Sequence, residues 1–471
     1  MNTYKEKTML TRSCLIGALI FFVVCVNGCS IDPNINKSPN DITQDQLATP
    51  TGVNGLIVGM QTMTGDFITS DHSRIAAMWS GQVTSSPDAT RAQAALWAHY
   101  ALDATGPPND MWLYAYKAVH ECDDILSIAP NVTLLVDTDK NRKIHNSIAA
   151  LAYTHKALIY GELAAMFGSI PVDLTDITKP GYAPPAFISQ ADAYTRVQSL
   201  LDKALSLMSN VPLPQDLNFG GDSASWVGVM HSLKARFYLH VSDYANALVQ
   251  SQMGISSAAG TLFAQYSNNS LEYSPWGFWV LDEAISIRAA KPFVDELKSE
   301  AGDTRLAAYF APTANKKILG FADSTLAHPV HATEPDEQSL GTVSDILKYG
   351  HYADNFPMIS FEENVLIRAE CEARTGAVAS AVTDVNIIRT NAGLKAFVSS
   401  DANGTIDQVL KQKWLQLFLE GQSYHDMRRT KTLPDPSPNH NFRIIYPQSE
   451  KNANPNTPPD NDNLARPLLQ Y

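Results

Sequence analysis

Apolar residues recur at three- and four-residue spacing through most of this 471-residue chain. That spacing places them along one face of an α-helix. Several segments also carry small residues at regular intervals, such as Ala150, Ala157 and Ala164, which let neighbouring helices approach closely. The pattern predicts a mainly α fold, a tetratricopeptide-like scaffold of helical hairpins with long irregular loops. The expected helices are residues 111–129, 141–167, 190–208, 223–251, 281–299, 361–375, 377–392 and 405–429.

Turn and capping residues mark some of the boundaries between these elements. Asp222 stands where a helix N-cap is expected, and Gly376 separates two helices that must fold back as a hairpin. Long polar stretches are predicted to be loops, and the segment from residue 432 to the end, which contains eight prolines, is predicted to be extended chain. The expected loops are residues 66–90, 263–280 and 313–356.

The N-terminus has the organisation of an export signal. Three cations precede an apolar run over residues 15–26, which is shorter than the roughly 20 residues that a membrane-spanning helix needs. Gly28 and Cys29 then follow, and this junction resembles the lipobox of bacterial lipoproteins, although Asn27 is not the usual small residue. The resemblance implies removal of residues 1–28 and acylation of Cys29. Residues 29–49 are then a flexible tether and residues 50–471 a single domain; the alternative is ordinary secretion with Cys29 as an incidental thiol.

Charge and cysteine content narrow the class of partner. The whole chain has a formal charge of −13, and without the signal its 47 acidic and 32 basic residues give −15. An acidic balance argues against nucleic acid as a partner and against electrostatic binding to anionic lipid. Cys122 and Cys371 are expected to be buried free thiols rather than a disulfide. The sequence lacks a Cys/His cluster of the kind that binds a structural metal, so neither a metal nor a cofactor is expected.

Motifs of the common enzyme classes are missing from the sequence. It contains no His-Glu-x-x-His zinc motif, no phosphate-binding loop, no dinucleotide fingerprint and no complete nucleophile elbow. Adjacent carboxylates such as Glu362 and Glu363 point about 100° apart on a helix, which suits capping or solvation better than acid–base catalysis. These absences argue against the common enzyme classes.

Four segments, taken together and in this order, resemble the SusD/RagB family of outer-membrane lipoproteins. They cover residues 141–173, 216–248 and 356–394, and end with Phe-Leu-Glu-Gly-Gln-Ser-Tyr-His-Asp-Met-Arg-Arg-Thr at residues 418–430. The match extends from about residue 41 to residue 456. One departure is the Tyr424-His425 pair before Asp426, where the family often has two bulky aromatic residues.

The resemblance implies four tetratricopeptide-like helix pairs with the ligand site on loops and irregular segments. It also implies a non-enzymatic protein at the outer membrane, facing the cell exterior, that binds an oligosaccharide or a peptide. That ligand would be passed to a SusC-like TonB-dependent transporter, over whose mouth the protein sits. Two alternatives stay open: a lipid-anchored helical scaffold that binds only protein partners, and a peptide-binding member of the same family.

Aromatic residues in the irregular stretches are the candidate ligand-binding residues, because flat aromatic faces stack on sugars at little cost in conformational entropy. The candidates are Trp79, Trp97, Tyr100, Tyr273, Trp276 and Trp279. Our hypothesis is that Trp276 or Trp279, together with Trp79, forms the stacking surface. The alternative is that these side chains attach the long loops to the helical body. Asp71, His72 and Arg74 are lesser candidates for polar contacts.

Other prominent residues are expected to be structural. Arg389 or Arg429 should hold a carboxylate or a backbone carbonyl. The remaining charged residues of the family segments are expected in buried or half-buried ion pairs, and three tryptophans in the core. These are Glu370, Arg374, Glu420 and Arg428, and Trp112, Trp226 and Trp414.

Overall fold

The computed structural model describes residues 44–85, 96–97, 102–172, 183–282, 287–312, 316–318, 346–432 and 443–460. Cys29, Tyr100, the signal segment and most of the expected tether lie outside these residues. Residues 1–47 and 48–471 form two separate compact units. In the part of the chain that is described, no helix has the length and apolarity to cross a membrane.

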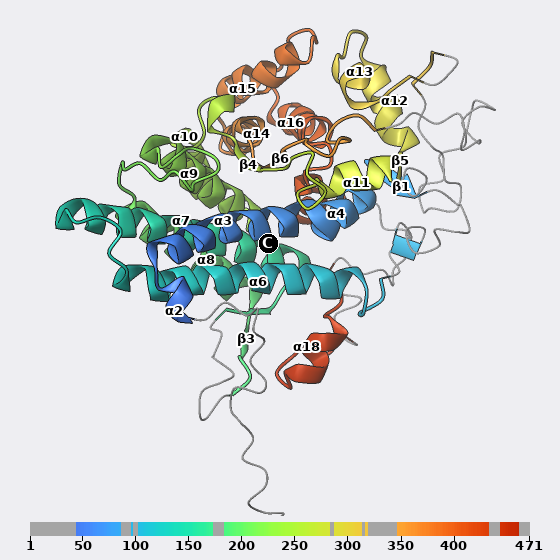
Figure 1. The fold of residues 1–471 in the computed structure, drawn as a ribbon. Helices are drawn as coiled ribbons and strands as arrows, with labels where there is room; N and C mark the ends of the chain where they lie inside the picture. Colours follow the sequence, from blue (N-terminus) through green and yellow to red (C-terminus); the bar gives the residue numbers. More distant parts are fainter. Residues whose placement is uncertain are drawn as a thin grey trace, which may run out of the picture. The chain divides into compact units, whose positions relative to one another are not determined.

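Helices dominate the structure (Figure 1), which confirms the predicted fold class. The first unit contributes helix α2 (Gln44–Leu47). In the second unit the helices are α3 (Pro50–Phe67), the π-helix η1 (Ile68–His72), α4 (Ser73–Trp79), α6 (Pro107–Ile128), η3 (Ala129–Asn131), α7 (Thr138–Phe167), α8 (Gln190–Leu207), α9 (Ser223–His240), α10 (Tyr244–Gln252), η4 (Ala258–Gly260), α11 (Pro275–Leu281), α12 (Lys291–Ser299), α13 (Arg305–Tyr309), α14 (Phe361–Arg374), α15 (Val378–Asn391), α16 (Ala402–Gln416), α17 (Gln422–Arg429) and α18 (Gln448–Ala453).

Three pairs of short antiparallel strands join segments that are distant in the sequence. They are β1 (Val83–Ser85) with β5 (Ile287–Ala289), β2 (Ile170–Pro171) with β3 (Phe187–Ile188), and β4 (Leu262–Ala264) with β6 (Phe356–Ile359). In the last pair Ala264 lies opposite Phe356, which brings the chain after β4 next to the chain before β6. Two stretches that were both predicted to be loops therefore lie side by side.

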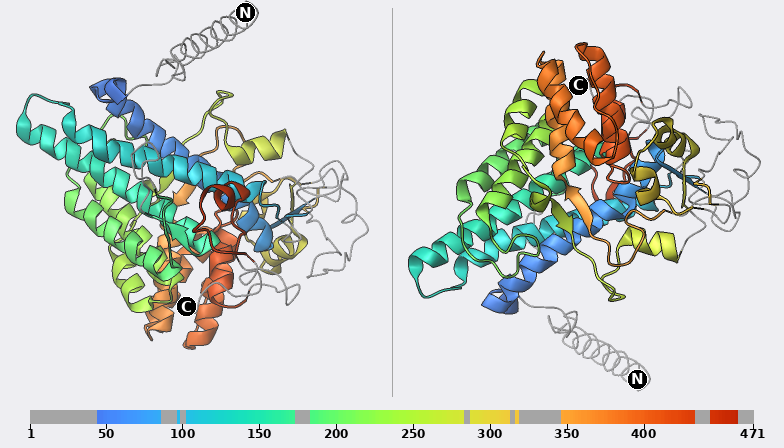
Figure 2. Two further views of the ribbon diagram at one scale, coloured as in Figure 1. Left: turned by 90° about the horizontal axis from the view of Figure 1, so that it is seen from below. Right: turned by 90° about the horizontal axis from the view of Figure 1, so that it is seen from above.

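The helices pack in pairs through buried apolar residues. The packed pairs are α3 with α6, α7 with α8, α9 with α10, and α14 with α15, and they lie side by side in the views of Figures 1 and 2. Helices α7 and α9 approach closely at Gly161, where a Cβ would lie 2.2 Å from the ring of Phe237. Only glycine fits at this crossing. A cluster around Val365, Leu366 and Val385 holds α14 and α15 together.

Helix ends follow the expected capping chemistry. The Asp222 carboxylate accepts a hydrogen bond from the Ser225 amide at the start of α9, which confirms the predicted cap. Ser360 caps α14 in the same way. Gly376, with φ of 94°, forms the turn between α14 and α15.

Three predicted helices differ from the structure. The segment 223–251 turns at residues 241–243 into α9 and α10, and the segment 405–429 breaks at residues 417–421 into α16 and α17. The break includes Leu419 with φ of 72°, which an uninterrupted helix does not allow. In the segment 281–299, Leu281 ends α11, residues 287–289 pair as β5, and α12 begins only at Lys291.

Three predictions of irregular chain were also wrong in part. The stretch 66–90 contains η1 and α4, and the stretch 263–280 contains most of α11, which Ser274 caps at the Gly277 amide. Within the Pro-rich C-terminal segment, α18 forms between two prolines. Short helices are compatible with a proline just before or within their first turn, and this use was not recognised from the sequence.

Cys122 and Cys371 are buried free thiols, as predicted. Burial raises the pKa of the Cys122 thiol well above its usual value and that of Cys371 to about 12. Both therefore stay protonated and behave as small apolar core residues.

Candidate ligand-binding cleft

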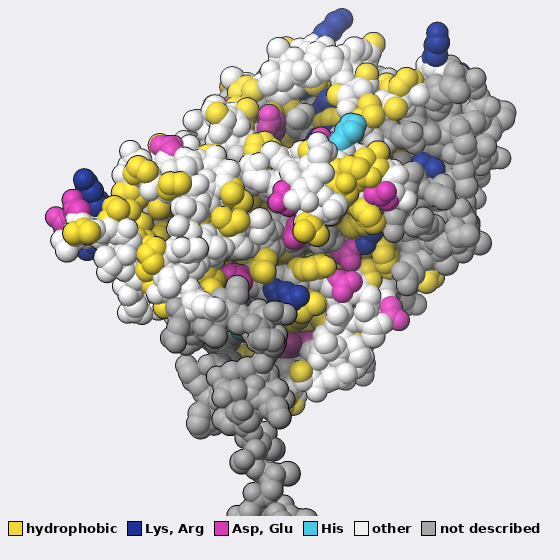
Figure 3. Space-filling view, viewed as in Figure 1, with side chains coloured by type: hydrophobic (Ala, Val, Ile, Leu, Met, Phe, Trp, Pro, Cys, Tyr) yellow, Lys and Arg dark blue, Asp and Glu magenta, His cyan; other side chains and the backbone are white. Residues whose placement is uncertain are grey.

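An open cleft of about 830 Å³ lies where the end of α3 and η1 meet the first turns of α6, the segment after β4, and α11. This volume is in the range of typical ligand sites. Its wall is aromatic and acidic, and its main lining side chains are Asp66, Asp71, Arg74, Asp110, Tyr114, Tyr266, Glu272, Tyr273, Phe278, Trp279, Asp282 and Tyr352. Figure 3 shows acidic and hydrophobic side chains close together over the region where Figure 1 places α3, α4, α6 and α11.

An interrupted helix shapes one wall of the cleft. The helical run that starts at Pro50 passes into the π-helix η1, and Ser70, with ψ of −135°, breaks it before α4. π-helical insertions of this kind are common at functional sites. Here the interruption places Asp71 and Arg74 at the cleft, with Asp66 one turn earlier.

A second wall is α11, which packs against η1 and which a buried tryptophan anchors. Trp276 is completely buried, and its Nε1 donates a hydrogen bond to Ser73 Oγ at 2.8 Å. Gly277 lies against the backbone of His351, where a Cβ would come within 2.3 Å of the carbonyl oxygen. With that face of α11 fixed, Phe278 and Trp279 line the cleft.

Half-buried and exposed aromatic rings line the cleft. Tyr273 and Tyr352 form a parallel pair with ring centroids 3.9 Å apart, and the Tyr352 hydroxyl donates to Asp282 Oδ2 at 2.9 Å. Phe278 and Tyr114 are 43% and 42% exposed. Aromatic rings flanked by carboxylates can contact both the C–H faces and the hydroxyl groups of a sugar.

Five of the six predicted aromatic residues are described, and they are divided between the cleft and its supports. Tyr273 and Trp279 line the cleft, although Trp279 is only 9% exposed. Trp79 and Trp276 are both buried, and Trp97 is half-buried. The Nε1 of Trp79 donates a hydrogen bond to the backbone oxygen of Trp97. Ligand contact by any of these six residues, including Tyr100 outside the described part, stays a prediction.

Several residues of the cleft were not identified from the sequence. Tyr352, Phe278 and Tyr114 complete its aromatic wall, and Asp66 and Asp110 its acidic one. Phe278 belonged to the loop that had been singled out. The others come from distant segments or from a helix end, and nothing in their local sequence indicates that they meet.

His72 lies in the interior rather than in the cleft. Its Nε2 is 3.1 Å from Glu162 Oε2, and His425 Nε2 is 3.2 Å from the same oxygen. Glu162 Oε1 accepts hydrogen bonds from Arg236 and Gln422 at 2.9 and 3.1 Å. Burial alone would raise the pKa of Glu162, but hydrogen bonding from the two histidines and the charge of Arg236 hold it well below its usual value.

These two histidines and Glu162 are the one group of potential metal ligands found in the described residues. Because Arg236 and Gln422 already occupy one carboxylate oxygen, the arrangement is that of a buried hydrogen-bonded carboxylate. The departure from the family pattern at His425 is thus accommodated by a polar partner in the core.

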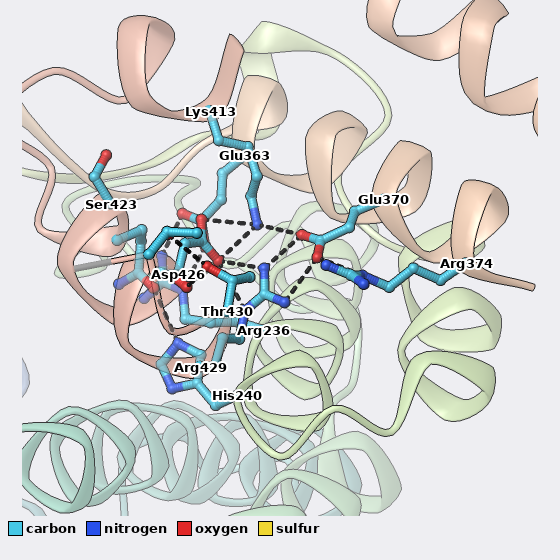
Figure 4. Close-up of polar contacts among 12 residues, drawn as sticks. Arg236, His240, Glu363, Glu370, Arg374, Lys413, Ser423, Asp426, Arg429 and Thr430 are labelled. Atoms are coloured by element: carbon cyan, nitrogen blue, oxygen red, sulfur yellow. Dashed lines mark hydrogen bonds and ion pairs between the residues drawn. The ribbon is translucent and has the colours of Figure 1, made fainter. Parts of the chain in front are cut away.

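A second buried cluster confirms the structural role predicted for Arg429 (Figure 4). Arg429 Nη1 donates to Glu370 Oε1 at 2.7 Å, and Lys413 Nζ lies 3.1 Å from Glu370 Oε2. Asp426 joins both cations, with Lys413 Nζ at 2.9 Å. Arg389 binds the Lys395 carbonyl, also as predicted.

Trp112 and Trp226 are buried, as expected, and Trp414 is half-buried with its Nε1 bonded to the Ser80 carbonyl. These three tryptophans therefore support the helices and take no part in the lining of the cleft.

Comparison with known families matches residues 44–444 to the SusD-like family, described as starch-binding and associating with the outer membrane. A SusD superfamily protein from Parabacteroides distasonis ATCC 8503 has a TM-score of 0.66 at 17% identity, covering 88% of this chain and 98% of that one. An outer membrane protein from Bacteroides vulgatus ATCC 8482, whose description refers to nutrient binding, has a TM-score of 0.64 at 17% identity over 85% and 93%. A chitin-binding protein has a TM-score of 0.61 at 15% identity over 85% and 94%. The sequence has no match among curated proteins.

Proposed function

Because the chain belongs to the SusD-like family, we propose that it binds an oligomeric nutrient, a glycan in the first place, in the cleft between α3, α6 and α11. The observation that carries this proposal is the open cleft of about 830 Å³ with aromatic faces beside carboxylates. The starch-binding description of the family favours a glycan over a peptide, as does a fold neighbour that is described as chitin-binding.

The protein acts at the outer membrane, held by acyl chains on Cys29 and facing the cell exterior. The outer-membrane association of the family supports this location, and the lipobox-like Gly28-Cys29 junction supports the anchor. A SusC-like TonB-dependent transporter receives the ligand. This part is tested by purifying the full-length protein from outer membranes in mild detergent: a large barrel protein should co-purify, and recovery of the protein without one contradicts the transporter.

Ligand binding is tested by calorimetry of the full-length protein in detergent against neutral and charged oligosaccharides and peptide digests. For a saccharide that binds, Tyr273→Ala should weaken binding about fivefold to tenfold, because one stacking contact contributes about 1 kcal/mol. Tyr153→Ala is the matched control, since Tyr153 is a half-buried tyrosine on α7 outside the cleft. If the two variants bind the saccharide with equal affinity, the glycan binds outside this cleft. If only peptides bind, the ligand is a peptide and not a glycan.

A further inference from the structure

The cleft has an unbalanced charge. Its described lining contains five carboxylates and one guanidinium, a formal net charge of −4. The carboxylates are Asp66, Asp71, Asp110, Glu272 and Asp282, and the guanidinium belongs to Arg74. They come from α3, η1, α6, the segment after β4, and the residue after α11, so several segments of the chain contribute negative charge to the cleft.

The single cation is already engaged by the protein. Arg74 forms an ion pair with Asp71, and its guanidinium carbon lies 3.7 Å from the ring centroid of Trp279 and 4.5 Å from that of Trp97. A guanidinium held by a carboxylate and by aromatic faces is a poor receptor for an anionic ligand.

The other four carboxylates have no ion-pair partner in the described part of the chain. Three of them accept hydrogen bonds from neutral hydroxyls: Asp66 from Tyr266 at 3.5 Å, Asp282 from Tyr352 at 2.9 Å, and Glu272 from Ser267 at 2.6 Å. These hydroxyls do not neutralise the charge. The cleft thus keeps free carboxylate charge beside its aromatic wall.

Electrostatic coupling between these groups supports this description. Partial burial and the neighbouring Asp71 raise the pKa of Asp110. Burial raises the pKa of Tyr114, and the charges of Asp110, Asp66 and Asp71 raise it further. The wall of the cleft therefore carries a negative potential, which attracts cations and repels anions.

A bound metal ion does not account for these acids. The group of three potential ligands that lies within 4.8 Å in the described residues is the interior one at Glu162, away from the cleft. Carboxylates that several segments contribute to one cleft suit a ligand that carries several positive charges along a chain.

We propose that the cleft selects an oligosaccharide whose sugars carry free, protonated amino groups, in preference to neutral and to uronic-acid oligomers. This inference rests on the proposed function and specifies its ligand class. The sugar rings contact Tyr273, Tyr352 and Phe278, and the ammonium groups meet Asp66, Asp110 and Asp282. A saccharide is favoured over a basic peptide because several flat aromatic faces lie beside the carboxylates, as sugar rings require.

The test is a charge series on one ligand size. The full-length protein in detergent is titrated by calorimetry, at about pH 6 where amines are mostly protonated, with hexamers of glucosamine, N-acetylglucosamine and galacturonic acid, and with hexalysine. The glucosamine hexamer should bind about tenfold more tightly than its acetylated form, equal to about 1.4 kcal/mol. The galacturonic acid hexamer should not bind. The preference should shrink as ionic strength rises from about 0.05 to 0.5 M.

A charge-neutralising variant assigns the effect to the cleft. Asp110→Asn should lower the affinity for the glucosamine hexamer about threefold, more than it lowers that for the acetylated hexamer. Asp139→Asn is the control, because Asp139 is an exposed acid in the first turn of α7, as Asp110 is in the first turn of α6. Equal responses of the two variants would overturn the assignment.

The outcomes separate the inference from the proposed function. Equal or tighter binding of the acetylated or the anionic hexamer overturns the amine preference but leaves a glycan-binding cleft. Hexalysine that matches the glucosamine hexamer overturns the saccharide assignment in favour of a basic peptide. Absence of binding to every saccharide, here and in the wider panel, counts against the proposed function itself.

Discussion

The cleft and the buried cluster around Glu370 are both built from charged side chains, but they balance charge in opposite ways. In the cluster, Glu370 and Asp426 meet Lys413 and Arg429, and Arg374 adds a further cation at 2.8 Å from Glu370. In the cleft, five carboxylates share one guanidinium.

The difference follows from access to water. A charge removed from water destabilises the fold unless an opposite charge compensates it, so the cluster is densely paired. Burial alone would raise the pKa of Glu370, but Arg429 and Lys413 hold it far below its usual value. In the open cleft water screens like charges, and an excess of one sign can persist. In the interior each charge therefore needs its partner, and in the cleft unpaired charges remain available to a ligand.

The largest expected effect comes from breaking the pairing in the interior. Glu370→Gln leaves Lys413 and Arg429 with Asp426 alone, and removal of one partner from a buried charge network costs about 3–5 kcal/mol. The free energy of unfolding from denaturant titration should fall by about that amount. Asp139, whose side chain is 83% exposed, pairs with Arg142. Asp139→Asn should therefore change the free energy of unfolding by less than about 1 kcal/mol. Similar losses in both variants would contradict the proposed contrast.

The sequence predicts those parts of the fold whose local pattern is strong. Helical periodicity identified most of α6 to α9, α14 and α15, because each has a long apolar face or a clear cap. It failed where tertiary contacts decide the structure. The pairing of β5 with β1 replaces helix in the first half of the expected segment 281–299, and a second expected helix breaks at Leu419. Local periodicity predicted a mainly α fold of helical hairpins, and the family resemblance supplied the expectation of four helix pairs.

The candidate site was predictable only in its local part. The aromatic run 273–279 pointed to the correct segment, but the sequence does not show that Trp276 faces inward and Trp279 towards the cleft. The acidic wall joins Asp66 and Asp110, which come from different helices. In the aromatic wall, Tyr352 meets Tyr273 because β4 pairs with β6. Such convergence depends on packing and not on local spacing.

A partly compensated pair of acids gives an effect of intermediate size. Arg368 binds Asp384, with Nη2 to Oδ1 at 2.8 Å, and Glu372 lies beside them. Burial and the Asp384 charge raise the pKa of Glu372 to about 7. The folded protein thus binds this proton more tightly than the unfolded chain, and stability is lost as pH rises from about 4.5 to 7.

Glu372→Gln should remove that loss. At about pH 8 the variant should be more stable than the parent protein by about 1 kcal/mol, after allowance for solvent screening, and near pH 4 this charge-dependent gain should disappear. Thermal unfolding at the two pH values measures the difference. A variant that is less stable at pH 8 would show that Arg368 compensates both carboxylates, as full pairing does in the interior.

The smallest expected effect has the opposite sign to that of Glu370→Gln and comes from the cleft. Asp66 lies in the last turn before the helix is interrupted at Ser70, at the negative end of the helix dipole. Burial raises its pKa, so ionisation of Asp66 in the folded state opposes folding as pH rises through and above 3.8, its value in the unfolded chain.

Asp66→Asn keeps an oxygen for the Tyr266 hydroxyl and removes the charge. We expect it to stabilise the protein by about 0.3–1 kcal/mol at neutral pH, and by nothing below about pH 3. Chemical denaturation at both pH values, with Asp139→Asn beside it, measures the change. Asp139 stands at the positive end of α7, so its loss should be neutral or slightly destabilising. If Asp66→Asn instead weakened the fold at neutral pH, its carboxylate would be a structural group like Glu370, and the cleft would lose one of the charges held for a ligand.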